Sequence, residues 1–257
     1  MKKSAILSIN NLVKRFGGLV AVNDVSFDVY PGEVVALLGD NGAGKSTIIK
    51  CISGVYQAEQ GEVIYNGKVV KFTHPSEARR QGIETIYQDL ALANNLDVSS
   101  NIFLGREVEK RIFGTPVKVL DDSFMLSESQ KAIDSLKIHI SDFSQAIENL
   151  SGGQRQAVAI ARASYWNAKL MIMDEPTNNL GVPEQKKVLG LIRKLRDEGV
   201  PIILISHTLP DVFAVADRLI VLHRGRKVAE KLAKETDSQE IVQYMVGALD
   251  DTKEPAK

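Results

Sequence analysis

Glycines, a lysine and hydroxyl residues are spaced for phosphate binding near the start of the chain. The loop Gly39-Asp40-Asn41-Gly42-Ala43-Gly44-Lys45-Ser46-Thr47 follows the apolar run Val34–Leu38. Glycines let a backbone approach phosphate closely, and successive N–H groups at a helix start form an anion-binding nest. In such a loop the Lys45 ammonium contacts the β and γ phosphates, and the Ser46 hydroxyl ligates Mg²⁺. The pattern predicts a nucleoside triphosphate site.

Two acidic residues follow a second apolar run, Leu170–Met173. Asp174 and Glu175 are expected at the carboxyl end of a buried strand, beside the phosphate loop. The aspartate can hold Mg²⁺ through water, and the glutamate can act as general base toward an attacking water. A solvated strand end with incidental acids is the alternative, and the phosphate loop favours the hydrolytic interpretation.

A second glycine-rich turn, Leu150-Ser151-Gly152-Gly153-Gln154, opens the predicted helix Gln154–Ala163. Ser151 is a good N-cap residue, and the N–H groups that follow it would form a second receptor for a γ-phosphate. Without the phosphate loop, an ordinary capped helix would be the better interpretation of this turn.

These motifs, in this order, resemble the ATP-binding subunits of ABC transporters over roughly Ser4 to Leu249. The resemblance implies an α/β P-loop domain, residues 1–249, with an antiparallel β lobe and an inserted helical signature lobe at about 89–166. It also implies that the protein binds ATP and Mg²⁺ and hydrolyses the ATP.

Four further residues gain roles from this resemblance. Phe16 would stack on adenine, with Val22 beside it. Gln88 would touch Mg²⁺ and respond to a membrane partner, and His207 would contact the γ-phosphate as a catalytic residue. The structural alternatives are a core phenylalanine, a loop amide and a satisfied histidine at a strand end. The order of the motifs favours the functional roles.

One position departs from the family's usual pattern. The family often carries an aspartate where Gly181 stands, after Asn178-Asn179-Leu180. A contact across the subunit interface therefore needs another residue here, for which Asn178 or Asn179 is the candidate. Catalysis by Lys45, Glu175 and His207 should persist.

The segment Gly82–Arg106 resembles bacterial importers of the ribose, xylose and fructose type. This resemblance implies an integral membrane permease as partner, a separate sugar-binding protein and a place at the cytoplasmic face of the cell membrane. Because the chain has one set of motifs, it should pair head to tail with a copy of itself. Each ATP would then lie between one subunit's P-loop and the other's Ser151–Gln154.

Composition excludes several other classes of protein. Lysines and arginines balance the acids at net charge zero, so nucleic acid is not an expected partner. The single cysteine, Cys51, cannot form an internal disulfide, and no apolar run approaches the roughly 20 residues of a membrane span. A soluble ABC ATPase usually has two cassettes, and a DNA-repair ATPase needs long heptad arms. An exporter cassette is disfavoured by the Gly82–Arg106 resemblance.

Apolar patterning and turn residues predict the elements that position these motifs. Strands are expected at Ile6–Ile9, Val25–Val29, Val34–Leu38, Glu62–Tyr65, Val69–Phe72, Glu84–Gln88, Leu170–Met173, Ile202–Ile205, Leu219–Leu222 and Lys227–Ala229. Helices are expected at Ser46–Ser53, Ser76–Gln81, Gln154–Ala163 and Pro183–Asp197. No strong strand is expected within the helical lobe, and the charged tail, residues 250–257, is expected to be disordered.

Overall fold

A six-stranded sheet lies at the centre of the computed structural model, which describes residues 4–112, 116–136 and 138–252. Its order is β12-β11-β3-β10-β9-β6, parallel except for the antiparallel edge pair β11–β12. The inner strands are runs of Val, Ile, Leu and Met buried on both faces, as parallel strands require. The strands are β3 (Val34–Leu38), β6 (Ile83–Ile86), β9 (Leu170–Asp174), β10 (Ile202–Ile205), β11 (Arg218–His223) and β12 (Arg226–Leu232).

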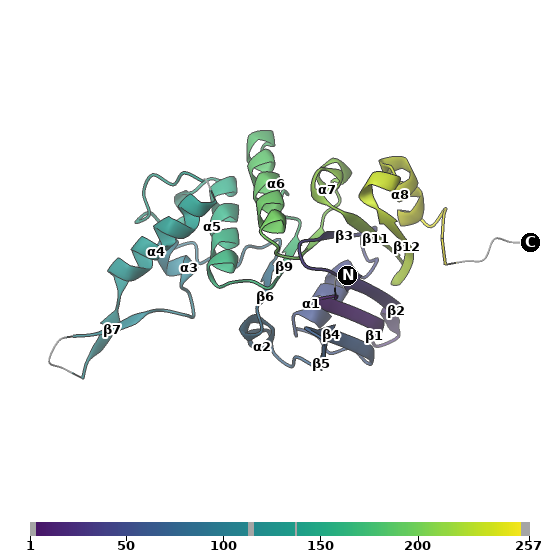
Figure 1. The fold of residues 1–257 in the computed structure, drawn as a ribbon, viewed down its shortest axis with the longest axis horizontal. Helices are drawn as coiled ribbons and strands as arrows, with labels where there is room; N and C mark the ends of the chain where they lie inside the picture. The colour runs from purple at the N-terminus through teal and green to yellow at the C-terminus, as the bar shows by residue number, and fades with distance from the viewer. Residues whose placement is uncertain (1–3, 113–115, 137, 253–257) are drawn as a thin grey trace, which may run out of the picture.

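A smaller antiparallel sheet, in the order β2-β1-β4-β5, lies below α1 and the central sheet in Figure 1. Its strands are β1 (Leu7–Phe16), β2 (Leu19–Val29), β4 (Gln60–Tyr65) and β5 (Lys68–Val70). β4 and β5 form a hairpin through Asn66-Gly67, and both residues have positive φ, 51° and 73°, as a type I′ turn requires. β1 and β2 are longer than predicted, since register shifts beyond Ile9 interrupt the alternation of apolar residues.

Helices cover the sheets and form the lobe that the sequence predicted. Three lobe helices lie at one end of the molecule, and α8 lies at the other (Figure 1). The helices are α1 (Lys45–Ile52), α2 (Pro75–Arg80), α3 (Val98–Ile102), α4 (Asp122–Ser135), α5 (Gly152–Tyr165), α6 (Val182–Asp197), α7 (Leu209–Val215) and α8 (Ser238–Met245), with 3₁₀ turns at Ile147–Asn149 and Ala233–Glu235. None of the helices within the described ranges is long and apolar enough to cross a bilayer.

The lobe also contains a short hairpin, β7 (Glu109–Arg111) with β8 (Lys118–Leu120), where no strand was predicted. All six residues of these strands are exposed, so no buried face gave them an apolar alternation in the sequence. The hairpin projects from the lobe beside α4 (Figure 1).

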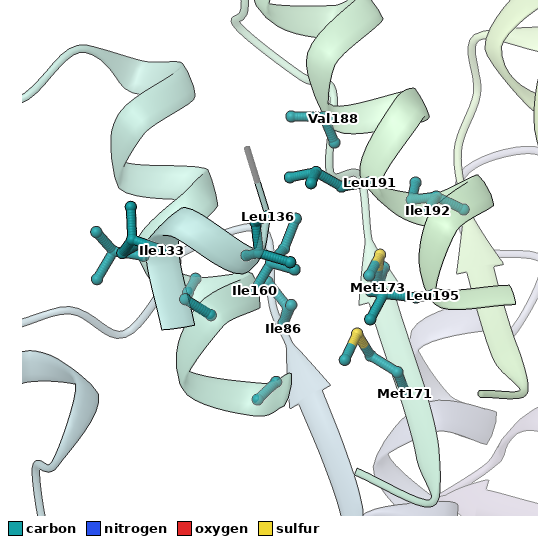
Figure 2. Packing of buried hydrophobic residues seen from close by; sticks show 14 of the residues in the cluster. Ile86, Ile133, Leu136, Ile160, Met171, Met173, Val188, Leu191, Ile192 and Leu195 are labelled. Atoms are coloured by element: carbon teal, nitrogen blue, oxygen red, sulfur yellow. The ribbon is translucent and has the colours of Figure 1, made fainter. Parts of the chain in front are cut away.

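One continuous apolar core joins the lobe to the central sheet. Figure 2 shows Ile160 of α5 and Leu136, at the end of α4, facing Met171 and Met173 of β9, with Leu191 of α6 beside them. A second cluster, between the two sheets, contains the buried residues of α1. The lobe is therefore inserted in the sequence but shares its packing with the sheet.

The first described residues of the predicted disordered tail are held in place. Asp251 accepts a hydrogen bond from Tyr244 Oη at 2.6 Å and forms an ion pair with Lys231 Nζ at 2.9 Å. Its N–H donates to Val228 O at 2.9 Å. The predicted boundary of the disordered tail at Asp250 is therefore too early in the sequence. Residues 253–257 lie outside the described residues.

Arg218 joins the two sheets at the edge opposite the phosphate loop. Its guanidinium forms a two-pronged ion pair with Glu33 at 2.8 and 3.0 Å and also pairs with Glu230. The same group donates to Asp28 O of β2 at 2.6 Å. Arg218 is buried, so these contacts fix β2 relative to β3 and β11.

Candidate active site

Parallel pairing collects the predicted catalytic residues at one edge of the central sheet. Ile205 of β10 lies opposite Leu37 of β3 on one side and opposite Asp174 of β9 on the other. The segments that leave these three strands are the P-loop, Glu175 and Ser206-His207. The carboxyl ends of parallel strands at such an edge are the usual ligand site of this class of sheet.

A cleft of about 670 Å³ opens at this edge, a volume within the range of small-molecule sites. It contains most of the predicted nucleotide-binding residues: Phe16, Asn41, Gly42, Ala43, Gly44, Lys45, Ser46, Thr47, Gln88, Asp174 and Glu175. The remaining lining residues are Leu19, Val20, Ala21, Ile205 and Arg224.

Close backbone packing dictates glycine at two P-loop positions. Gly39 has φ 147°, and a Cβ there would lie 2.4 Å from Leu222 O. Gly44 has φ 103°, and a Cβ there would lie 2.5 Å from Ala21 O. Both contacts are with backbone atoms that cannot move aside, so the loop fits its surroundings only without these side chains.

The Lys45 ammonium is turned toward the P-loop itself. Its Nζ donates to Gly39 O at 2.7 Å and to Asp40 O at 3.0 Å. Burial lowers the pKa of Lys45, against the opposing effect of Glu175 and Asp174. Burial, with the neighbouring Glu175 charge, raises the pKa of Asp174. A cation and two acids thus share a partly desolvated edge.

Glu175 has an unusual backbone and a direct histidine partner. Its φ is 52°, a left-handed conformation that is uncommon outside glycine, and its N–H donates to Ile205 O at 2.9 Å. Glu175 Oε1 lies 2.9 Å from His207 Nδ1, and Oε2 accepts from the His207 N–H at 3.4 Å. Because a carboxylate accepts, Nδ1–H is the donor. The structure therefore brings the predicted general base, Glu175, into contact with His207, the histidine predicted to contact the γ-phosphate.

The residues predicted for Mg²⁺ are hard oxygen donors on the cleft wall: the Ser46 hydroxyl, the Gln88 amide and the Asp174 carboxylate. No group of three or more His, Cys, Asp or Glu side chains suited to a metal occurs among the described residues. This small donor set fits Mg²⁺, which usually keeps several waters and is bound by one or two carboxylates together with phosphate oxygens.

The Phe16 side chain is 42% exposed at the mouth of the cleft. Its ring meets Tyr56 edge to face, with 5.1 Å between centroids, and Lys14 Nζ lies 5.1 Å from the Phe16 centroid. This exposed ring is available to a planar ligand. Val22, predicted beside adenine, is instead fully buried in the core between the sheets and does not line the cleft.

The second glycine-rich turn, Leu150–Gln154 (the signature turn), lies outside this cleft. Ser151 caps α5 in a capping box: its Oγ accepts from Gln154 N at 3.3 Å, and Gln154 Oε1 accepts from Ser151 N at 3.0 Å. Ser151, Gly153 and Gln154 line a separate cleft of about 400 Å³ beside α6. Within one chain, the two phosphate motifs therefore do not share a cavity.

Arg224 is a cleft residue that the sequence reasoning missed. Arg224 was assigned no role from the sequence, yet it lines the cleft with φ 49°. The turn is fixed on both sides, because Gly225 N donates to Ala43 O at 3.1 Å and Asn23 N donates to Gly225 O at 2.7 Å. The Arg-Gly pair between two strands was the available signal.

A larger groove, about 770 Å³, lies on the other side of the end of β6. The strand predicted over Glu84–Gln88 ends at Ile86, after which Tyr87 lines the groove and Gln88 lines the cleft beside the P-loop. Arg106 pairs with Glu84 at 2.9 Å in this groove. Burial raises the pKa of Glu84, against the opposing effect of Arg106.

Comparison with known proteins agrees with this geometry. The ABC transporter family model matches residues 22–178. The chain is 49% identical to the xylose/arabinose import ATP-binding protein XylG of Sulfolobus acidocaldarius, over 94% of each chain. It is 45% identical to the fructose import ATP-binding protein FrcA of Rhizobium meliloti, over 99% of this chain and 98% of that protein.

The ribose import ATP-binding protein RbsA of Geobacillus kaustophilus is 40% identical over 94% of this chain, which spans only 48% of that relative. Among solved structures, a nucleotide-free ATP-binding cassette from an ABC transporter superposes with a TM-score of 0.81 at 27% identity, covering 95% of this chain and 100% of that one. The chain therefore belongs to the ABC transporter family, as one of its ATP-binding proteins.

Proposed function

We propose that this protein is the ATP-hydrolysing subunit of a monosaccharide importer, acting as a head-to-tail homodimer bound to a membrane permease at the cytoplasmic face. The contact of Glu175 with His207, at a cleft that also contains Lys45, is the observation that carries hydrolysis. The names of the relatives, which import xylose or arabinose, fructose and ribose, support a monosaccharide as cargo.

In this mechanism the P-loop N–H groups and Lys45 bind the β and γ phosphates. Ser46, Gln88 and Asp174 would hold Mg²⁺, which when bound neutralises charge on the phosphate oxygens. Glu175 accepts the proton of the attacking water, and His207 keeps the carboxylate aimed at the γ-phosphate.

The separation of the signature turn from the nucleotide cleft supports the dimer. Ser151–Gln154 does not line the chain's own cleft, so it would close over the ATP of a second copy. The sugar-binding protein would act through the permease, and nucleic acid is not proposed as a partner.

The groove beside Tyr87 is the proposed permease site. It is larger than the nucleotide cleft, and its polar groups include the half-buried Glu84–Arg106 pair. Tyr87 Oη lies 3.3 Å from Ser53 Oγ, at the end of the P-loop helix α1. A permease segment in this groove would thus touch Tyr87, the residue before Gln88. Through the contact of Tyr87 with Ser53, it would also be linked to the end of α1.

The Phe16→Ala change should weaken ATP and GTP binding to a similar extent, because stacking on an aromatic ring tolerates any base. A stacking contact contributes roughly 1–3 kcal/mol in nucleic-acid cases. Fluorescent nucleotide titration measures both affinities, with Leu19→Ala as a control at the cleft mouth. A loss for ATP alone would mean that the base is recognised by hydrogen bonds instead.

The Glu175→Gln change should preserve ATP affinity and lower the hydrolysis rate by about 10²–10⁴-fold, as expected for loss of a general base. Because ATP would then persist, size-exclusion chromatography should show a stable ATP-bound dimer. Lys45→Ala should lose ATP binding and remain monomeric. Near-normal turnover by Glu175→Gln would refute the role of Glu175.

A Ser151→Cys, Gly42→Cys double variant, with Cys51→Ala to remove the native thiol, should crosslink between chains when ATP is present. The head-to-tail arrangement brings the signature turn of one copy over the P-loop of the other. Gel electrophoresis under non-reducing conditions separates dimer from monomer, and each single-cysteine variant is a control. A crosslink confined to one chain contradicts the dimer.

The tagged chain should co-purify from detergent-solubilised native membranes with a multi-span permease, identified by mass spectrometry. Arg106→Glu should abolish this association but leave ATP binding intact, because it replaces the cation paired with Glu84 by a repelling carboxylate in the groove. Lys118→Glu, on the exposed β7–β8 hairpin, is the matched control. Recovery of ribosomes or another soluble assembly in place of a permease would contradict the transport role.

A further inference from the structure

The loop after Glu175 packs directly against the signature turn of the same chain. A Cβ placed on Gly152 would lie 3.0 Å from Leu180 Cδ2. A Cβ placed on Gly153 would lie 2.6 Å from Glu184 Cγ and 2.9 Å from Glu184 Cβ. A side chain at Gly153 would therefore have to displace Glu184, whereas one at Gly152 would need only a small shift of Leu180.

The Glu184 side chain is the larger part of this contact. Its Oε2 lies 2.7 Å from the position of a Cβ on Gly181, so one side chain fills the space beside two glycines. Glu184 is half-buried in the first turn of α6 and lines the signature cleft with Ser151 and Gly153. Among the described residues its carboxylate has no hydrogen-bond or ion-pair partner, so packing alone accounts for its position there.

The same loop is connected to the catalytic glutamate by a short hydrogen-bonded path. Asn178 N donates to Glu175 O at 3.1 Å, and Leu180 N donates to Thr177 O at 3.4 Å. Thr177 is buried, which anchors the middle of the turn. A displacement at Leu180 or Glu184 can therefore reach Glu175, because close-packed groups transmit strain.

We propose that Glu184 is a positioning residue whose stem keeps the signature turn in register with the Glu175 loop. Closure of Ser151–Gln154 on a partner's ATP then adjusts the general base of the chain's own site, which couples the two sites. The inference rests on the proposed head-to-tail dimer. In this proposal Glu184, rather than Asn178 or Asn179, links the two sites in place of the aspartate that the family often carries at position 181.

The test compares Glu184→Ala with Glu184→Gln, which keeps the stem and removes only the charge. Glu184→Ala should lower kcat on the order of tenfold, within the range of typical coupling between sites, and reduce the Hill coefficient for ATP toward one. ATP affinity of the monomer and the melting temperature should stay near the parent values. Glu184→Gln should behave as the parent. Glu198→Ala, an exposed acid at the other end of α6, is the control for lost charge.

Gly181→Ala tests whether the stem alone matters. Its Cβ would displace only the flexible end of Glu184 and leave the stem on Gly153, so the variant should fold normally and keep the parent kcat and Hill coefficient. Added to Glu184→Ala, it should cause no further loss, because the side chain that it crowds is already gone.

Three results would overturn the inference: parent-like kinetics of Glu184→Ala, an equal defect in Glu184→Gln, or the same defect in Gly181→Ala. These outcomes leave ATP hydrolysis and the dimer untouched. A parent protein that hydrolyses no ATP, or never dimerises with it, would instead defeat the proposed function.

Discussion

Parallel pairing of β3 with β10 and of β10 with β9 is the constraint on which the site depends. A strand register fixes not only neighbours but also ends, and here three strands end together at Leu38, Asp174 and Ile205. The P-loop, the two acids and His207 therefore lie at one edge of the sheet because of the strand register alone, without needing direct contacts to bring them together. Burial of these strands on both faces makes that register hard to change.

Local strain and tight packing refine what the sheet delivers. Glu175 adopts a left-handed backbone between two well-packed elements, which turns its carboxylate to His207 instead of along the strand. Such conformations persist where the surroundings over-determine them. At the end of β6, the consecutive residues Tyr87 and Gln88 line two different cavities. One peptide unit thus joins the linings of the two cavities.

Most of the sheet and much of the cleft beside the P-loop could be predicted from sequence, because continuous apolar runs and glycine-rich loops carry strong local signals. Most of the P-loop, Asp174 and Glu175 follow from these signals and line that cleft, whereas Gln88 was assigned from the family resemblance. β3 and β10 have their predicted bounds. Contacts between distant segments could not be predicted. The place of Arg224 in the cleft depends on the path of a turn, and the burial of Val22 depends on the facing sheet. The position of Glu184 depends on the space beside Gly153 and Gly181, for which the sequence gives no local signal.

The apolar core shared by the helical lobe and the sheet has a consequence for how the protein unfolds. Leu136 and Ile160 of the lobe pack in one cluster with Met171 and Met173 of β9 and Leu191 of α6, so neither part has a complete interior of its own. Excising the lobe would expose apolar surface on both pieces, and neither would be an autonomous folding unit. Denaturation should accordingly be a single cooperative transition, with the lobe and the sheet losing structure together.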